Sequence, residues 1–370
     1  MDSFAFIIHP IDPKRDIQRK YPLLGKIAPD WMIYKFSPLW PPVYLAKMEG
    51  ITSVATGKQI QGYLLACPLS PRHFLGLPEK QVYTKIIETG RLAEKLGAGI
   101  LGLGAFTSVV GDAGVTIARA LAIPVTTGDA YTVAVAVEAV WEAANRMEIP
   151  LASATIAVVG ATGAIGQVCA EMLAAGEIPP AELLLIGLRP DALQAVRNRL
   201  ADHWPDLSII VSTDLADLRR AHLVITVTSA VEAVISPDYI RPGAVVCDVA
   251  RPRDVAAQLA AKRQDILVID GGMVQTPGGA EMDFHFNFGL PKGMVFACMA
   301  ETITLALEGR FEDYTLGKQI QLAHVQEIRA MAHKHGFRLS GFRSFERPVT
   351  QQQIDRVREM AYQAGSNDAK

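Results

Sequence analysis

Short apolar runs separated by turn residues open the chain, and this pattern predicts a mixed α/β domain. Residues 4–8 form an apolar run with strand character, and residues 51–66 form two such runs joined by Gly57-Lys58, which predicts a β-hairpin. Three prolines mark irregular chain around Trp31 and Trp40. The further elements expected are a helix over 78–95, a buried strand over 99–104 and a helix over 129–147. Residues 1–149 therefore form an N-terminal α/β domain.

From residue 150 onward, strand-like runs alternate with helical ones. The strands are expected at 155–160, 183–187, 208–211, 223–227, 244–248 and 266–270, and the helices at 164–175, 192–203 and 255–262. Such alternation predicts a parallel, doubly wound sheet of the Rossmann type in residues 150–291. Residues 292–370 are then a C-terminal helical segment packed back on the core, with helices expected over 292–308, 316–335 and 350–363.

A glycine-rich turn follows the first of these strands. The segment Gly160-Ala161-Thr162-Gly163-Ala164-Ile165-Gly166 lies between a β-branched strand and a helix. Glycines permit a tight turn and a close approach of backbone N–H groups to a pyrophosphate, which the helix N-terminus also attracts. The segment departs from G-x-G-x-x-G because Thr162 takes the second glycine position, and a purely structural turn is the alternative. We expect a dinucleotide site here, formed by Gly160, Thr162, Gly163, Ala164, Ile165 and Gly166.

The second strand of this domain indicates which dinucleotide is bound. It ends without the carboxylate that binds an NAD ribose, and Arg189 stands about 20 residues beyond the last glycine. A guanidinium suits a ribose 2′-phosphate, so NADPH is favoured over NADH, with a solvated surface arginine near Asp191 as the alternative. Thr228 and Ser229 follow the fourth strand and are expected to border the cofactor, although a helix cap explains them equally well.

The chain has four cysteines far apart and no C-x-x-C pair, so no metal site is expected. Cys298 stands near the start of the helix expected at 292–308. A helix N-terminus lowers a thiol pKa from about 8.5, and Lys292 is expected to strengthen that effect. A thiolate beside a nicotinamide can hold an acyl group as a thioester for reduction. The alternative is a buried core cysteine, which is common.

Other polar residues give weaker signals. Thr107 and Ser108 follow a buried strand, so they are expected to line a substrate cleft or to donate to an oxyanion. His285 lies shortly before Cys298 and is a candidate acid or base. Glu301 is one helical turn from Cys298, where capping or packing also explains it.

Composition and charge exclude several classes of protein. The chain has 370 residues and a formal net charge of −2, which gives no basic face for nucleic acid. No basic region precedes the first apolar residues, so a signal peptide is not expected. Residues 149–170 are uncharged, but recurring glycines favour a strand, turn and helix over a membrane segment. Separate, reduced thiols fit a cytoplasmic protein.

Four segments in order along the chain resemble the cyanobacterial-type long-chain fatty acyl–acyl-carrier-protein reductase family. They are Thr52-Ser53-Val54-Ala55-Thr56-Gly57-Lys58, Gly104-Ala105-Phe106-Thr107-Ser108, the strand and glycine turn from Val158 to Gly166, and Phe296-Ala297-Cys298-Met299-Ala300-Glu301. The resemblance implies a reductase that uses NADPH to turn fatty acyl thioesters of acyl-carrier protein or coenzyme A into fatty aldehydes. It also implies that residues 1–149 bind the acyl substrate and that Cys298 takes the acyl group. Residues 277–290 and those beyond Leu339 depart from the family, so acyl chain length and carrier stay open.

Two other functions fit the same domains. A dehydrogenase of shikimate or amino-acid type transfers hydride without covalent catalysis, and it needs a lysine–aspartate pair in its cleft. A non-catalytic NADP-binding regulator needs only the glycine turn. The sequence does not identify the lysine–aspartate pair.

Overall fold

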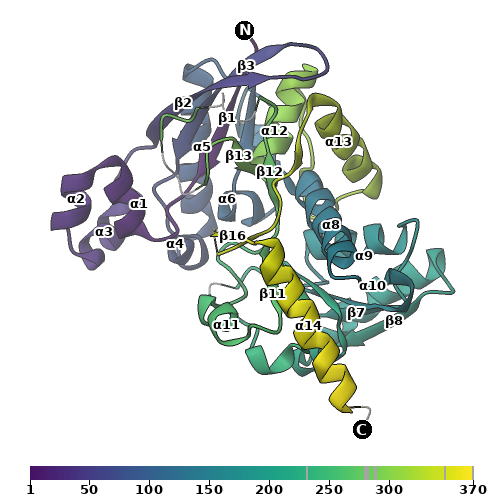
Figure 1. The fold of residues 1–370 in the computed structure, drawn as a ribbon. Coiled ribbons are helices and arrows are strands. Elements are labelled where there is room, and N and C mark those ends of the chain that lie inside the picture. The colour runs from purple at the N-terminus through teal and green to yellow at the C-terminus, as the bar shows by residue number, and fades with distance from the viewer. Residues whose placement is uncertain (231, 279–282, 287–289, 346, 369–370) are drawn as a thin grey trace. The chain divides into compact units, whose positions relative to one another are not determined.

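The computed structural model describes the chain except residues 231, 279–282, 287–289, 346 and 369–370. The chain forms two compact units (Figure 1). Unit 1 comprises Met1–Tyr131 and Met273–Arg338, and unit 2 comprises Thr132–Gly272 and Leu339–Lys370. The units therefore divide the chain at other points than the boundaries at 149 and 291 that the sequence suggested.

Unit 1 is built on a five-stranded sheet with the order β2-β3-β1-β4-β5. Strands β2 and β3 pair antiparallel as a hairpin, but its first strand ends at Thr52 and not at residue 56 as expected, and the other neighbouring strands pair parallel. The apolar side chains of β4, and those of β1 except Ile8, are buried in the core, as expected for central strands. The strands are β1 (Ser3–Ile8), β2 (Val43–Thr52), β3 (Gln59–Ala66), β4 (Ile100–Leu103) and β5 (Val125–Thr126).

Helices and short strands complete unit 1. The chain around Trp31, expected to be irregular, forms three short helices between β1 and β2. The helices are α1 (Pro13–Lys20), α2 (Pro22–Ile27), α3 (Asp30–Phe36), η1 (Ser37–Leu39), α4 (Pro71–Gly76), α5 (Glu79–Lys95), α6 (Phe106–Val109), α7 (Val115–Ala120), α12 (Ala297–Glu308) and α13 (Leu322–His335). The short strands are β12 (Met273–Gln275), β13 (Met294–Phe296) and β14 (Arg338–Leu339).

Helix α12 packs on β1 and β4, which confirms that C-terminal helices pack back on the core. It begins at Ala297, five residues later than the sequence predicted. The reason is that residues 294–296 pair antiparallel with residues 273–275, so the chain is extended there and not helical. Cys298 is consequently the second residue of the helix.

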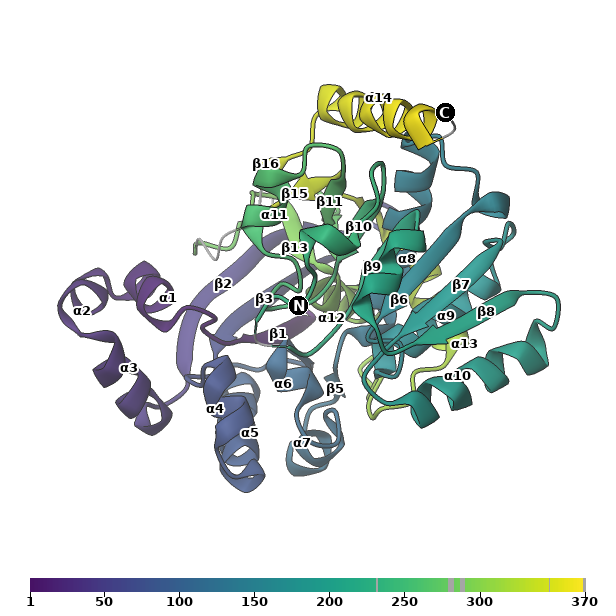
Figure 2. The ribbon, with the colours of Figure 1, turned by 90° about the horizontal axis from the view of Figure 1, so that it is seen from below.

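Unit 2 contains a six-stranded sheet whose order is β11-β10-β9-β6-β7-β8 (Figure 2). All neighbouring strands pair parallel. The first strand is central, the next two lie on one side and the last three on the other, which is the order of the Rossmann fold. The predicted doubly wound sheet is thus confirmed. The strands are β6 (Thr155–Val159), β7 (Glu182–Ile186), β8 (Ser208–Ser212), β9 (Leu223–Thr226), β10 (Val245–Asp248) and β11 (Leu267–Asp270).

Helix α8 (Asp129–Arg146) starts in unit 1 and continues in unit 2. The other elements of unit 2 are η2 (Leu151–Ser153), α9 (Ala164–Ala174), α10 (Pro190–His203), η3 (Leu215–Arg220), η4 (Pro237–Tyr239), α11 (Ala257–Lys262), β15 (Arg343–Ser344), β16 (Arg347–Pro348) and α14 (Gln351–Asp368). Of the helices in the described part of the chain, none has the length and apolar character needed to cross a bilayer.

Candidate functional site

The predicted glycine turn links β6 to α9 in unit 2. Gly160 has a φ of +84°, a conformation that favours glycine, and a Cβ there would lie 3.0 Å from the carbonyl oxygen of Val227. A Cβ on Gly166 would lie 2.3 Å from the carbonyl oxygen of Gly160, so only glycine lets helix and strand approach this closely. Gly163 is the N-cap of α9 and offers no side-chain hydrogen bond. The N–H groups at this helix start, including those of Ala164 and Ile165, therefore fit a pyrophosphate.

The loop after β7 lies against this turn. The Gly160 N–H donates to the carbonyl oxygen of Ile186 at 2.9 Å, and a Cβ on Gly187 would contact the Thr162 side chain at 3.5 Å. Arg189 follows at the N-cap of α10, where it is exposed and has no carboxylate partner in the described part of the chain. The contact of Gly187 places the loop that carries Arg189 beside the predicted glycine turn.

The loop after β9 is anchored by a residue that the sequence did not indicate. Asp254 is fully buried, and its carboxylate accepts from the Thr226 hydroxyl at 2.5 Å and from the Thr228 N–H at 3.0 Å. The Thr228 hydroxyl also donates to Asp254. Thr228 thus holds the loop in place, whereas Ser229 beside it is exposed. Asp254 lies 28 residues after Thr226 in a different loop, so only the fold reveals the pair.

In unit 1, Cys298 lies in the first turn of α12. Of the four cysteines, all of them described, Cys67, Cys169 and Cys247 are buried and Cys298 is partly exposed. The backbone of Gly128 passes directly over it, because a Cβ on Gly128 would lie 2.3 Å from the Cα and Cβ of Cys298. Gly128 has a φ of +77°, so this contact again requires glycine.

Two buried carboxyl groups accompany this cysteine. Glu301, one turn further along α12, is fully buried. Its carboxylate accepts from the Thr126 hydroxyl at 2.5 Å, from the Tyr131 N–H at 2.8 Å and from the Thr315 hydroxyl. Asp129, the first residue of α8, is also buried. The loop between Thr126 and Asp129 thus joins the cysteine to both carboxyl groups.

Burial and like charge set the protonation of this cluster. Burial raises the pKa of Asp129 to about 8, and the negative charge of Glu301 adds to the rise. Burial also raises the pKa of Glu301, although the hydrogen bonds from Thr126, Thr315 and the backbone N–H groups of Tyr131 and Gly128 oppose that rise. With a pKa of about 8, Asp129 carries a proton at neutral pH.

The thiol pKa differs from the expectation. Burial raises the pKa of Cys298 to about 12, and the negative charges of Asp129 and Glu301 add to that effect. Lys292 does not counter them, since it is exposed and lies 4.0 Å from a carboxylate oxygen of Asp283. The expected lowering by the helix start and Lys292 is therefore wrong, and the thiol is neutral at pH 7. This rise could not be predicted from residue patterns, because Asp129 is distant from Cys298 along the chain and has the pattern of a helix cap.

Thr107 and Ser108 are buried in α6, directly after β4. Their hydroxyls donate to the carbonyl oxygens of Gly104 and Ala105, each at 2.8 Å. Strands β4 and β5 pair parallel, so α6 lies at the same edge of the sheet as the loop that follows Thr126. The hydroxyl hydrogens are already used in the turn, and the contribution of these residues is to shape this edge.

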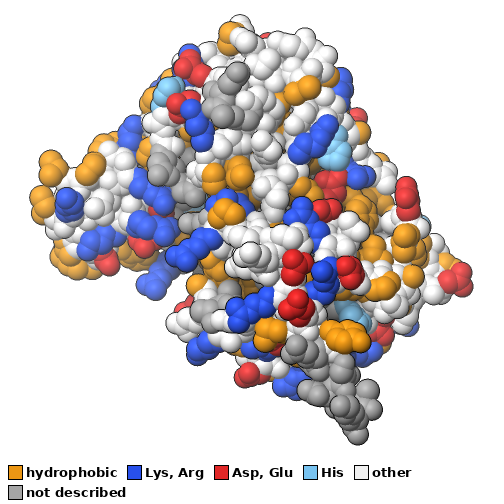
Figure 3. Space-filling view, in the orientation of Figure 1, with side chains coloured by type: hydrophobic (Ala, Val, Ile, Leu, Met, Phe, Trp, Pro, Cys, Tyr) orange, Lys and Arg blue, Asp and Glu red, His pale blue; other side chains and the backbone are white. Residues whose placement is uncertain are grey.

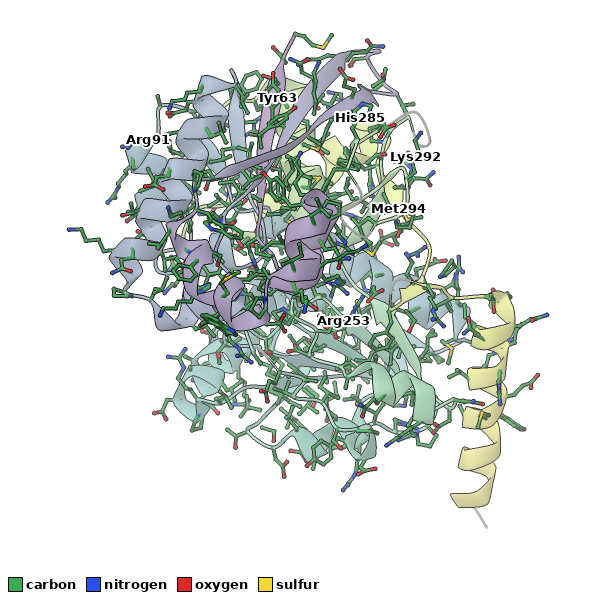
Figure 4. All side chains as sticks on the ribbon, turned by 90° about the vertical axis from the view of Figure 1, so that its left-hand side faces the viewer. Tyr63, Arg91, Arg253, His285, Lys292 and Met294 are labelled. Carbon is green, nitrogen blue, oxygen red and sulfur yellow. The ribbon has the colours of Figure 1, made fainter. Side chains whose placement is uncertain are left out.

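His285 lies with Lys292 on the surface of unit 1 (Figure 4). Its ring nitrogens are 3.5 Å from a carboxylate oxygen of Glu49 and 3.9 Å from one of Asp283. These are its charged neighbours among the residues that the structure describes. The structure thus places His285 at the edge strand β2, where Glu49 and Asp283 also form a backbone bridge. Its segment, residues 277–290, lies partly outside the described residues.

The strand order and the glycine turn define a Rossmann-type fold, and the second α/β unit carries a cysteine beside two buried carboxyl groups. No family model matches the chain. The aminotransferase PigE of Serratia sp. (strain ATCC 39006) is 30% identical over 360 residues, which are 95% of this chain and 41% of PigE. The chain thus spans about two fifths of that protein.

A second curated relative matches over most of its own length. The long-chain acyl-[acyl-carrier-protein] reductase of Synechococcus elongatus (strain ATCC 33912 / PCC 7942 / FACHB-805) is 28% identical over 301 residues, 76% of this chain and 84% of the reductase. Among solved structures, L-tryptophan dehydrogenase from Nostoc punctiforme has a TM-score of 0.42 at 12% identity and covers 99% of this chain and 89% of its own. Quinate dehydrogenase from Corynebacterium glutamicum in complex with NAD has a TM-score of 0.38 at 11% identity, covering 89% and 98%. The assignment of the fold rests on the strand order itself.

Proposed function

We propose that this protein is an NADPH-dependent oxidoreductase that converts fatty acyl thioesters of acyl-carrier protein or coenzyme A into fatty aldehydes through an acyl-enzyme on Cys298. One observation carries the proposal: the partly exposed cysteine lies in the first turn of a buried helix, against the loop that bears Asp129 and beside Glu301. This arrangement supplies a nucleophile together with a proton acceptor, which is what covalent acyl transfer needs. The 28% identity to the long-chain acyl-[acyl-carrier-protein] reductase supports the substrate class.

A neutral thiol needs a base that takes its proton during attack, and in this proposal the carboxyl pair is that base. The sulfur of Cys298 attacks the thioester carbonyl carbon, and its proton passes to the pair formed by Asp129 and Glu301. The new carbon–sulfur bond forms, the bond to the carrier sulfur breaks, and the carrier thiolate takes the proton. The thiol pKa near 12 means that this transfer must accompany the attack and cannot precede it to any large extent.

The start of α12 stabilises the negative charge on the acyl oxygen. The N-cap Phe296 makes no side-chain hydrogen bond to the helix, and the N–H groups of Cys298 and Met299 are directed at the Cys298 sulfur, where the acyl group would be held. Such groups, aimed along the helix axis, are suited to an oxyanion. In this proposal they replace Thr107 and Ser108, whose hydroxyl hydrogens are bonded elsewhere.

The turn from Gly160 to Gly166 would hold the pyrophosphate of the cofactor, Arg189 its 2′-phosphate, and Ser229 would border it. When bound, NADPH supplies the hydride that reduces the acyl carbonyl. Asp129, which takes up a proton from solvent after the carrier thiol has left, then donates it to the Cys298 sulfur as the aldehyde leaves. The cycle therefore consumes one proton from solvent for each aldehyde formed.

The test is to incubate the protein with palmitoyl-CoA or octanoyl-CoA without NADPH and to map mass additions by peptide. We expect an acyl increment on the peptide that contains Cys298, removed by hydroxylamine as a thioester would be. Cys298→Ser, with a side chain of nearly equal size, should lose it. Aldehyde formation from an acyl-CoA with an unmodified Cys298 would refute the proposal.

A dehydrogenase of amino-acid type, without covalent catalysis, is the second candidate. The raised pKa of the Cys298 thiol favours it, because such a thiol is a poor nucleophile unless a base assists. In that case Asp129 and Glu301 serve hydride transfer as acid and base. The two candidates predict different effects of removing the Cys298 sulfur on the rate of the reaction.

A further inference from the structure

Residues 9–42, here called the helical lobe, leave the sheet of unit 1 after β1 and return as β2. The lobe contains α1, α2, α3 and η1, which lie together at one end of unit 1 beside β2 in Figures 1 and 2. Helices α1 and α2 touch closely, because a Cβ on Gly25 would lie 2.5 Å from the Cβ of Gln18. The Tyr34 ring stacks on His73 of α4 with a centroid distance of 4.2 Å. The lobe therefore packs against the rest of unit 1 through specific contacts.

The outer faces of the lobe are apolar. On α2, Leu23 and Ile27 are one turn apart and 76% and 79% exposed, while Gly25 between them faces α1. On α3, Trp31 is 65% exposed and lies on the side opposite the buried Ile33. Seventeen large hydrophobic side chains are exposed in the described part of the chain, and eight belong to this lobe: Ile11, Tyr21, Leu23, Ile27, Trp31, Tyr34, Phe36 and Leu39. A concentration of this kind marks an interaction surface.

The lobe is also basic, although the whole chain has a net charge of −2. It contains six Lys or Arg residues against three Asp residues. All three aspartates interact within the lobe. Asp12 caps α1, and the carboxylates of Asp16 and Asp30 each lie 3.4 Å from a side-chain nitrogen, of Arg19 and Lys14 respectively. Lys26 and Lys35 are exposed and have no carboxylate partner among the described residues.

Basic and apolar side chains share the same faces. Lys26 is one turn from Leu23 on α2, and Lys35 is one turn from Trp31 on α3. Figure 3 shows blue and orange side chains next to each other over the lobe, at the left of the view. Side chains of Trp, Leu and Ile beside Lys are typical of helices that lie in a membrane interface, with the ammonium groups at the level of the lipid phosphates.

We propose that the helical lobe binds this protein to the surface of an anionic phospholipid bilayer, with Leu23, Ile27 and Trp31 in the interface and Lys26 and Lys35 on the headgroup phosphates. Charge complementarity selects this partner over a second copy of the chain, because two lobes with a net positive charge repel each other. The exposed aliphatic and aromatic groups select it over an acidic carrier protein, which a basic polar face would suffice to bind. The proposal does not depend on the proposed function.

The test is co-sedimentation of the full chain with extruded vesicles. One preparation contains phosphatidylcholine with one quarter phosphatidylglycerol, and the other contains phosphatidylcholine alone. We expect binding to the anionic vesicles, weakened by high salt, and little binding to the neutral ones. The double change Leu23→Ser with Ile27→Ser should weaken binding at least about tenfold. Lys26→Glu with Lys35→Glu should abolish the preference for the anionic lipid.

Ile178 and Leu188 provide the matched control. Both are exposed, at 56% and 93%, and belong to unit 2, outside the lobe. Ile178→Ser with Leu188→Ser should leave vesicle binding unchanged. Because all these side chains are exposed, the variants should keep the thermal melting temperature of the wild type. Subtracting the emission of Trp31→Phe from that of the wild type should show a blue shift of Trp31 on anionic vesicles.

Several outcomes overturn the proposal. One is the absence of sedimentation with anionic vesicles, and another is binding that the Leu23 and Ile27 changes do not affect. A concentration-dependent dimer, without vesicle binding, that these two changes dissociate would assign the lobe to a second copy. Capture of purified acidic acyl-carrier protein by the lobe, again without vesicle binding, would assign it to that partner. None of these readouts uses aldehyde formation, so they are independent of the catalytic proposal.

Discussion

The two units carry the same local device at the end of a parallel strand. In unit 1, Thr126 ends β5 and its hydroxyl donates to buried Glu301. In unit 2, Thr226 ends β9 and its hydroxyl donates to buried Asp254. Each carboxylate also receives a backbone N–H of the following segment, from Tyr131 or Thr228. In both places a buried acid fixes the loop that leaves the sheet.

The two sites differ in the second acidic residue, which lies beside the carboxylate that anchors the loop. In unit 2 that acid is Asp248, whose carboxylate accepts the N–H groups of Ala250 and Val255. Burial raises the pKa of Asp248 to about 6, and the positive charge of Arg251 limits the rise. In unit 1 the second acid is Asp129, and no cation among the described residues offsets Glu301 there. Its pKa accordingly rises further, to about 8.

A counter-charge thus decides what a buried acid pair can do. With Arg251 present, Asp248 is largely ionised at neutral pH, and both carboxylates of unit 2 accept backbone N–H groups and so anchor loops. Without a cation, the pair of unit 1 holds a proton that it can release and regain near pH 8, next to Cys298. We therefore expect changes in the unit 1 cluster to affect catalysis and changes in the unit 2 loops to affect nucleotide binding.

Removing the sulfur gives the largest expected effect. Cys298→Ala should lower aldehyde formation at least ~10³-fold, because no acyl-enzyme can form. NADPH binding by fluorescence should be unchanged, since the glycine turn belongs to the other unit. A variant that keeps more than about one tenth of the activity would instead favour the non-covalent dehydrogenase.

Removing the proton acceptor comes next. Asp129→Asn should lower the rate of Cys298 acylation ~10²-fold at pH 7, as is typical for loss of a general base. In the wild type the acylation rate should rise with pH through about 8, because Asp129 accepts the thiol proton only when ionised. In the Asp129→Asn variant the acylation rate should no longer rise with pH through this range. Asp248→Asn is the matched control in unit 2 and should retain this rise.

The glycine turn is the third target. Gly160→Ala should weaken NADPH binding by roughly tenfold to a hundredfold, because φ is +84° and the new Cβ would meet the Val227 carbonyl oxygen at 3.0 Å. Gly57→Ala separates strain from contact, since Gly57 has a φ of +68° and open space around its Cβ position. Both variants should lose about 1–2 kcal/mol of stability, and titration calorimetry should show a binding defect in Gly160→Ala alone.

Arg189→Ala should weaken NADPH binding by about tenfold and leave NADH binding nearly unchanged, since the guanidinium is expected on the 2′-phosphate. Arg356→Ala, which removes another exposed arginine of unit 2, should affect neither cofactor. Equal losses for both cofactors in Arg189→Ala would remove the argument for NADPH.

Local pattern predicted unit 2 well because its elements are local. Each strand is a short apolar run, each helix follows within a few residues, and the turn from Gly160 to Gly166 needs only its own backbone. Thr228 shows the limit of prediction from local pattern, since its hydrogen-bond partner Asp254 comes from another loop. The helices of the lobe were missed because their apolar residues are exposed and show no buried periodicity.

The cluster of unit 1 shows the same limit in its chemistry. The sequence identified Cys298, but it predicted a lowered pKa from neighbours along the chain, such as Lys292. The groups that raise the pKa, Asp129 and Glu301, come from two helices that start more than a hundred residues apart. Only the packing of α12 under the loop at Gly128 brings them to the sulfur. Electrostatics of a buried site thus follows from tertiary contacts, which residue patterns do not contain.

The smallest expected effect concerns stability and separates the two acid pairs directly. Asp129 has a folded-state pKa of about 8 against an ordinary value of 3.8, so the folded protein holds a proton that the unfolded chain has lost. Its stabilising protonation is complete below pH 4 and is lost as pH rises through about 8. Asp248, at about 6, completes its change earlier. The free energy of unfolding should fall by about 1–2 kcal/mol between pH 6.5 and 8, and urea titrations should show a flatter profile for Asp129→Asn but not for Asp248→Asn. Equal slopes in the wild type and Asp129→Asn would show that the unit 1 pair holds no extra proton and that a nearby positive charge does not distinguish the two sites.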